Sequence, residues 1–400
     1  MVWFAFAFVV ASALRPTTHR VAVPRRRVGG AVARSDVSPS EVGGAAAVAW
    51  CRDAFPGAAV EVCNAEDGIS LSAIFWDVVV ATQRQERSGR ETVLFYERAS
   101  LSVAGWVAMV ASLGVEGLSC DAIEDAPLPG VRLRLAEDWV AAADVDDDTA
   151  GGAPDCMRTW VQDVIVDSKV CPFTRNRDLA ATGLEAAGIN SGPVGYPVCA
   201  VSGSDGPALA RVMCAFWGSS IALLSKHPEA ESTQLLCVPG FAVDDHDAFA
   251  KMCAAVVANL KFVQADYELS LVFFHPQYRR DLIEPVDKPA HGHLPPQPWV
   301  RAYAAVLHPM DADSLSDAEL QRANAQRTSP FTMINILRAD QVEAAEKLVP
   351  WEVIEPSGGR RLRVSGAKVY AANIWRFARA ATAKVTADGH EYLVSLRSLK

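Results

Sequence analysis

The chain has 400 residues, half of them hydrophobic, which is enough to build the cores of two or three domains. Its formal net charge is −9, but residues 1–35 hold six of the 38 basic residues and no acid, so 32 basic residues remain against 47 acidic ones. This balance excludes a general nucleic-acid binder. No apolar run is long enough for a membrane span, and the nine cysteines lack the paired spacing of a zinc ribbon or a disulfide scaffold.

The first 35 residues have the features of a targeting sequence. The short apolar run Val2–Val10 is followed by the small residues Ala11-Ser12-Ala13, which is typical of a secretory signal peptide. A stretch rich in Arg, Ser, Thr and Ala follows, as in an organelle transit peptide. The two signals in series resemble the bipartite presequence of complex plastids, so we expect residues 1–35 to direct the chain to the plastid stroma. Secretion is the alternative.

Residues 40–140 predict a small N-terminal α+β domain without a recognisable catalytic motif. Turn signals such as Asp67-Gly68 separate its apolar runs. The expected elements are an alanine-rich helix from Ser40, a β-type run Ala58–Cys63, a second run Ile69–Thr82 rich in Ile and Val, a strand Thr92–Glu97, an apolar helix from Ser100 to Gly114, and strands Val115–Cys120 and Val131–Leu135.

Residues 141–154 have the composition of a linker between two domains. Asp144–Asp148 contains four aspartates, and the following Thr149–Pro154 is rich in helix breakers. The acids lack the alternation of a calcium-binding loop, so a solvated hinge is the favoured interpretation.

Residues 155–349 predict a second α+β domain. A helix with an apolar stripe from Met157 to Val164 comes first, and the expected order continues as strand, helix, strand, helix, strand, strand, helix. These elements include a strand Thr233–Val238, a helix Asp244–Leu260 with an apolar face from Phe249 to Leu260, and a last helix with Asp340 and Glu343 in capping-box positions. This order predicts a two-layer α/β sandwich, ferredoxin-like or related to it. The last 50 residues, 350–400, form a basic extension with a hairpin expected around Ser357-Gly358-Gly359.

Three short motifs carry a family resemblance. Cys171-Pro172-Phe173, Phe274-His275-Pro276-Gln277-Tyr278 and Ser329-Pro330-Phe331 follow one another with strands and helices between them. In this pattern residues 160–348 resemble an uncharacterised family of bacteria and plastid-bearing eukaryotes, domain of unknown function 1415. The chain has Val238 and Asn335 where that family usually has histidines. The resemblance implies an architecture and a set of candidate residues. No established activity comes with the family, and any cofactor is unknown.

The motifs supply the candidate site residues. His275 ends a central strand, where an imidazole can act as an acid or base, and Cys171 is a candidate nucleophile if a base holds it as thiolate. Each residue also has a structural interpretation: Cys171 as a small buried hydrophobe on a tight turn, and His275 as a cap of the strand end. The candidate ligand contacts are Tyr278, Arg279, Arg280, Arg327 and Ser329, because arginines can clamp a carboxylate or phosphate.

Two other patterns are weaker. His291, His293 and His308 have no carboxylate at helical spacing, so a surface loop is favoured over a metal site. The turn Ser202–Gly206 before a helix resembles a phosphate cradle but lacks the lysine of a P-loop, which favours an ordinary capping turn.

Two functions therefore remain open. In the first, the family-like domain is a small enzyme or metabolite-binding domain for an anionic small molecule, with His275 as acid or base. In the second, the protein is a non-catalytic stromal adaptor or assembly factor, and the partner is a plastid protein.

Overall fold

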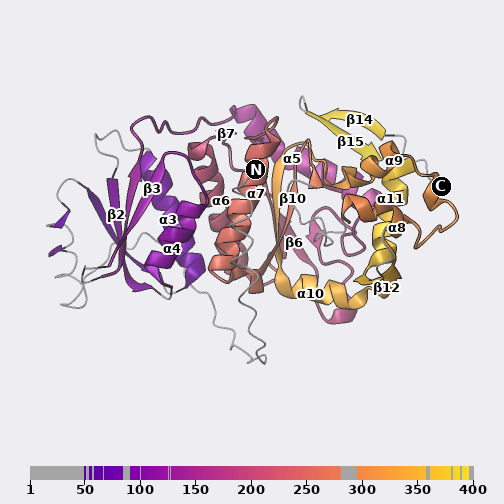
Figure 1. Ribbon diagram of the computed structural model, residues 1–400, viewed down its shortest axis with the longest axis horizontal. Helices are drawn as coiled ribbons and strands as arrows, with labels where there is room; N and C mark the ends of the chain where they lie inside the picture. The colour runs from indigo at the N-terminus through magenta and orange to yellow at the C-terminus, as the bar shows by residue number, and fades with distance from the viewer. Residues whose placement is uncertain are drawn as a thin grey trace.

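The computed structural model describes residues 49–50, 54–55, 58–65, 67–83, 91–99, 101–124, 126, 128–280, 295–356, 361–379, 382–387 and 390–395. The expected presequence and the helix start at Ser40 lie outside these residues. The described chain has mixed helices and several small sheets, which confirms the α+β class (Figure 1).

A four-stranded sheet and two helices make up the first unit, residues 58–135. Its elements are β1 (Ala59–Ala65), α3 (Gly68–Gln83), β2 (Glu91–Ala99), α4 (Val103–Ser112), β3 (Leu118–Ile123) and β4 (Gly130–Leu135). The strand order is β1-β2-β4-β3, with β1 parallel to β2 and the other neighbours antiparallel.

The run Ile69–Thr82 was expected as a β-type segment and is instead most of α3. Asp67 accepts a hydrogen bond from the Ser70 backbone N–H at 2.7 Å, as a helix N-cap does. The helix is buried on more than one side, so its apolar residues show no simple stripe. Packing therefore overrides the β propensity of its Ile and Val residues.

The second unit, residues 147–348, contains a five-stranded sheet. Its elements are α5 (Asp147–Trp160), a π-helix η1 (Val161–Asp167), β5 (Leu179–Ala180), β6 (Gly192–Gly195), α6 (Gly206–Leu224), β8 (Thr233–Val238), α7 (His246–Phe262), β10 (Leu269–Phe274), α8 (Val300–Ala304), α9 (Asp317–Arg322), β11 (Thr332–Arg338) and α10 (Ala339–Leu348). The strand order is β10-β11-β8-β6-β5. The structure has the predicted order of elements. Because β6 and β8 are parallel and joined through α6, this arrangement is related to the ferredoxin-like order β-α-β-β-α-β but distinct from it.

Two local features differ from the expectation. The acidic segment is not all linker, because Asp146 caps α5 by accepting from the Thr149 backbone N–H at 2.8 Å, and residues 147–154 are helical. The acids instead occupy the first turn, where they complement the helix dipole. The capping box expected at Asp340 and Glu343 is also absent, since Arg338 is the N-cap of α10 and has no side-chain cap.

The C-terminal extension folds back on the second unit. It contains the antiparallel pair β12 (Trp351–Ile354) and β13 (Leu362–Ser365), which confirms the expected hairpin, and then α11 (Ala367–Arg379). A further antiparallel pair follows, β14 (Thr382–Ala387) and β15 (His390–Ser395).

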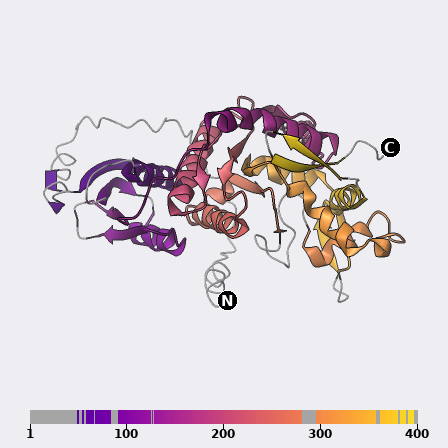
Figure 2. The ribbon, with the colours of Figure 1, turned by 90° about the horizontal axis from the view of Figure 1, so that it is seen from above.

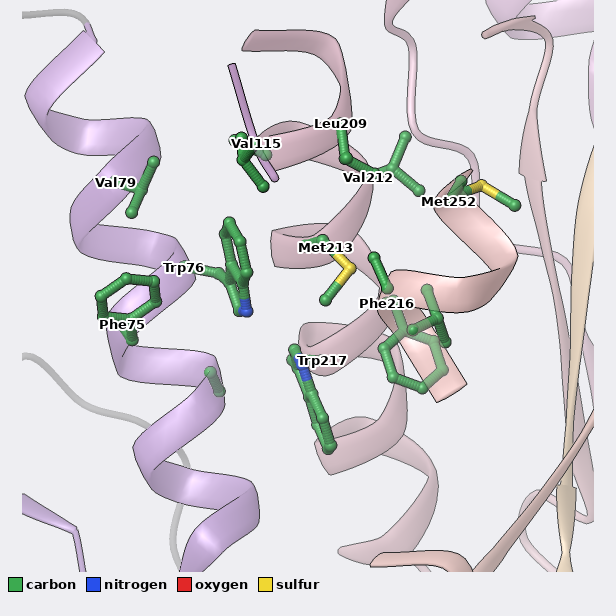
Figure 3. Packing of buried hydrophobic residues seen from close by; sticks show 14 of the residues in the cluster. Phe75, Trp76, Val79, Val115, Leu209, Val212, Met213, Phe216, Trp217 and Met252 are labelled. Carbon is green, nitrogen blue, oxygen red and sulfur yellow. The ribbon is translucent and has the colours of Figure 1, made fainter. Parts of the chain in front are cut away.

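The two units share one hydrophobic core. Helices α3 and α4 of the first unit pack against α6 and α7 of the second, so the layers run sheet, helices, helices, sheet (Figures 1 and 2). Figure 3 shows Trp76 of α3 between the two helices, facing Met213 and Trp217 of α6. Among the described helices, α6 is long and apolar enough to cross a membrane by length and composition, and most of it is buried in this core.

A buried asparagine joins the units at the centre of that core. Asn259 of α7 accepts hydrogen bonds from the indole N–H groups of Trp76 at 3.1 Å and Trp217 at 2.9 Å. Its Nδ2 donates to Ser72 Oγ of α3 at 3.2 Å. These contacts satisfy polar groups that would otherwise be costly in an apolar core.

Candidate functional site

A large cavity lies on the face of the second sheet that points away from α6 and α7. Its volume is about 690 Å³, within the range of small-molecule sites. We call it the sheet-face cavity. Its walls are mainly apolar and come from the helix before the sheet, the sheet itself, α10 and the β12–β13 hairpin: Trp160, Val161, Ile165, Leu235, Val272, Phe274, Leu337, Val342, Ala345, Val349, Leu362 and Val364.

Strand alternation explains why β10 serves both faces of the sheet. Leu271 and Phe273 point toward the core shared with the first unit, whereas Val272 and Phe274 belong to the cluster on the cavity side. Successive side chains of a strand point to opposite faces, so an apolar run such as Leu269–Phe274 is a strand covered on both sides.

Arg327 brings a buried cation to the cavity wall. Its side chain is 2% exposed, and Nη1 donates to the Phe273 carbonyl oxygen at 3.0 Å. The guanidinium carbon lies 5.4 Å from the centre of the Phe274 ring and 5.7 Å from that of Tyr278. Aromatic faces hold a guanidinium in place with little competition from water.

Further polar groups line the same cavity. Gln341 accepts from Ser232 Oγ at 3.0 Å through Oε1, while its buried Nε2 has no hydrogen-bond partner among the described residues. Asn335 accepts from Thr233 Oγ1 at 3.0 Å. Burial raises the pKa of Tyr370 to about 12, and the nearby charge of Arg327 opposes that rise. A ligand with hydrogen-bond acceptors would therefore meet neutral and positive donors at this wall.

Cys171 lies in the loop that follows η1. The loop is held by buried Asn373 of α11, whose Nδ2 donates to the Val170 carbonyl at 2.8 Å and to Gln326 Oε1 at 3.2 Å. Burial raises the pKa of the Cys171 thiol, although hydrogen bonds with Thr174 and with backbone groups oppose this. A raised pKa keeps the group as thiol at neutral pH, which is the opposite of an activated nucleophile.

His275 is not in the cavity. It is fully buried on the other face of the sheet, with its ring stacked on Phe249 of α7 at 4.3 Å between centroids. Nε2 bonds to the Ala242 carbonyl at 2.8 Å, so this nitrogen carries the proton, and Nδ1 accepts from the Gln277 backbone N–H at 3.0 Å. Strand alternation separates the His275 ring from the cavity that Cys171 lines, and both imidazole nitrogens are already bonded, so the structure does not bring these two candidate residues together.

The backbone of His275 nevertheless helps to hold Arg327. The His275 N–H donates to the Arg327 carbonyl at 3.2 Å, and the Ser329 N–H donates to the His275 carbonyl at 3.4 Å. Ser329 is itself buried and donates from Oγ to the Phe331 carbonyl at 2.5 Å. The end of β10 and the segment before β11 are thus fixed to each other, and His275 and Ser329 are positioning residues.

The other predicted contacts are divided. Tyr278 is buried and contacts the Arg327 guanidinium with its ring. Arg280 is buried near Tyr303. Burial raises the pKa of Tyr303, and the positive charge of Arg280 opposes that rise. Arg279 is exposed, and its backbone N–H donates to His246 Nε2 at 2.9 Å. Of the seven predicted site residues, only Cys171 and Arg327 line the sheet-face cavity.

Sequence reasoning missed Asn335, Gln341 and Tyr370. Asn335 could have been found, because it is a polar residue in the middle of the otherwise apolar run Met333–Leu337 of β11. Gln341 and Tyr370 come from α10 and α11, and only the fold shows that these helices cover the sheet. Nothing in their local sequence distinguishes them from surface residues.

The weaker sequence patterns do not add to the site. Within the described residues no group of three His, Cys, Asp or Glu side chains could hold a metal ion, and His291 and His293 lie outside these residues. His308 packs edge-on against Trp375 at 5.1 Å between ring centroids. In the turn before α6, Asp205 accepts from the Ala208 N–H at 2.9 Å as an ordinary N-cap.

Part of this unit is similar to a known family. Residues 153–299 match the model of the family described as protein of unknown function DUF1415. The matched segment contains the motifs at Cys171 and His275, while Arg327 and the Ser329-Pro330-Phe331 motif lie beyond it. No curated protein and no solved structure matches the chain.

Proposed function

We propose that the second unit binds a small organic anion with a largely apolar body in the sheet-face cavity. The observation that carries the proposal is a cavity of about 690 Å³ with apolar walls and a buried arginine among its lining residues. Apolar walls favour a hydrocarbon or aromatic body, and a guanidinium favours a carboxylate, sulfonate or phosphate.

Binding, rather than catalysis by a thiol and an imidazole, is what the geometry supports. His275 and Cys171 lie on opposite faces of the sheet, and the pKa of the thiol is raised. The proposed ligand is an anion, as the sequence predicts, and its contact in the cavity is Arg327. His275 and Ser329 hold the segment of Arg327 in place through backbone hydrogen bonds.

A matched pair of fluorescent probes tests the proposal. 8-Anilinonaphthalene-1-sulfonate and N-phenyl-1-naphthylamine share their rings, and only the first carries an anion. Arg327→Gln should weaken binding of the sulfonate about tenfold or more, since a hydrogen bond to a charged group contributes about 1.5–3 kcal/mol, and should change binding of the neutral probe little.

Two further variants complete the test. Arg279→Gln removes an exposed arginine outside the cavity and should leave both affinities unchanged. Ala345→Trp adds bulk from α10 and should weaken both probes, because it fills the cavity. The proposal would be contradicted if Arg327→Gln lowered the affinity for both probes equally, or if Ala345→Trp left both affinities unchanged.

The adaptor hypothesis makes a different prediction, because motif residues that only shape loops need no common concavity. Cys171, Phe173 and Phe274 of the first two motifs line the sheet-face cavity together, which supports ligand binding.

For the location, we propose the plastid stroma from the composition of residues 1–35. Mass spectrometry of the mature N-terminus tests this, and a start before Leu14 would contradict it.

A further inference from the structure

The four-stranded and the five-stranded sheet share one topology. In the first unit the order β1, α3, β2, α4, β3, β4 gives the sheet β1-β2-β4-β3. In the second, the order β6, α6, β8, α7, β10, β11 gives the sheet β6-β8-β11-β10, with β5 added at the edge. The second unit also has the two-residue strands Ser202–Gly203 after β6 and Gly240–Phe241 after β8, and it has α8 and α9 between β10 and β11. In both, the first two strands are parallel and the remaining pairs are antiparallel.

The first helix in each of these orders, α3 or α6, begins in the same way. Asp67 and Asp205 are N-caps, and each is followed by a glycine as the first helical residue, Gly68 or Gly206. An aspartate cap is common. The glycines are more informative, because each lies where a larger residue would collide with the other unit.

The two collisions are reciprocal. A Cβ atom on Gly68 would lie 2.6 Å from the Cβ of Val263, which ends α7 of the second unit. A Cβ atom on Gly206 would lie 2.3 Å from the carbonyl oxygen of Glu116, which follows α4 of the first unit. Each first helix therefore contacts the turn after the second helix of the other unit.

Those turns also correspond. The residue after the C-cap is left-handed in both, Gly114 with φ 63° and Gln264 with φ 58°. Both turns bury an apolar residue immediately afterwards, Val115 and Ala265, in the shared core.

The helices meet their counterparts across the interface. Helix α3 packs on α6, and α4 packs on α7, the pairing that a two-fold axis between two copies produces. Both α3 and α6 carry a Phe-Trp pair, Phe75-Trp76 and Phe216-Trp217, and the indole of each pair lies between the two helices (Figure 3). The indoles of both pairs donate to the same side-chain oxygen of Asn259.

We infer that residues 59–135 are a diverged second copy of the unit formed by residues 192–338, and that this copy covers the α6–α7 face as an attached partner in the place of a second chain. The outer sheet faces have diverged. In the first copy this face carries the ion pairs of Arg132 and Arg134 with Glu91, whereas in the second it forms the wall of the cavity.

Cleavage of the full chain tests the inference. A protease site inserted after Val140, which is 72% exposed in the connection between the units, separates them covalently and leaves the four interface helices α3, α4, α6 and α7 unchanged. If the contact is a subunit interface, the two pieces elute together at the mass of the uncut chain, as measured by light scattering. Separation of the pieces at micromolar concentration would overturn the inference.

Reciprocal substitutions test the two-fold relation. Gly68→Leu and Gly206→Leu in the cleavable chain should each raise the dissociation constant of the pieces, about tenfold or more, because each overpacks the equivalent contact. Gly218→Leu on α6 is the matched control, because a Cβ atom there meets no other atom within 4 Å. It should leave the dissociation constant of the pieces unchanged. An effect at only one of the two glycines, or at neither, would contradict the relation.

Discussion

The Asn259 side chain is predicted to stabilise the contact between the two units. Replacing it with leucine keeps the approximate volume but removes the acceptor of the Trp76 and Trp217 indole N–H groups, which lie 3.1 and 2.9 Å from Oδ1. A buried donor left without a partner costs about 1–3 kcal/mol, so two donors cost about 2–6 kcal/mol. Ser72 loses one contact but still donates to the Gly68 carbonyl at 2.9 Å.

Urea unfolding followed by tryptophan fluorescence and far-UV circular dichroism measures this loss. Asn259→Leu should lower the unfolding free energy by the amount above, and in a Trp217→Phe background the same change should cost about half as much, since one donor is already gone. Asn64→Leu, at an exposed position of β1, is the control and should change the free energy by less than about 0.5 kcal/mol. A loss below about 1 kcal/mol for Asn259→Leu would refute the reasoning.

Burial lowers the pKa of His275, with His246 adding to the shift and hydrogen bonds to Ala242 and Gln277 opposing it, so the unfolded chain binds the proton more readily. The stability that neutral His275 contributes is complete above the ordinary histidine pKa of about 6.5 and is lost as pH falls. The melting temperature of His275→Gln should therefore drop less between pH 7.5 and pH 5.5 than that of the unmodified protein. An equal drop in both proteins would count against this role of His275. The raised pKa of Cys171 predicts slower alkylation by iodoacetamide at pH 7.5 in the folded protein than in urea, as followed by peptide mass spectrometry, and a faster rate would indicate an activated thiol.

The sequence was sufficient for much of the second unit because its elements have strong local signals. Thr233–Val238 was predicted as a strand with the bounds that β8 has, and the apolar face of α7 was visible from Phe249 to Leu260. The first unit was harder, because α3 lies between a sheet and another helix layer and shows no one-sided pattern. The shared topology of the two units also depends on strand pairing, which no local pattern encodes.

Motif positions alone do not define the candidate site. The structure brings Phe274 of the second motif and Arg327 together at one rim of the sheet. The sheet face on which each side chain lies depends on the register of the strand. Neighbouring residues point to opposite faces, so Phe274 lines the cavity while His275 lies on the other face. The cover from α10, β13 and α11 comes from distant segments, so the cavity itself was not predictable.

The most direct test of ligand binding is a crystal structure of the protein soaked with 8-anilinonaphthalene-1-sulfonate. The account predicts electron density for the naphthalene between the sheet and α10, with a sulfonate oxygen within about 3 Å of the Arg327 guanidinium. Density at an outer surface, such as the exposed Tyr267, with the sheet-face cavity holding none, would contradict it.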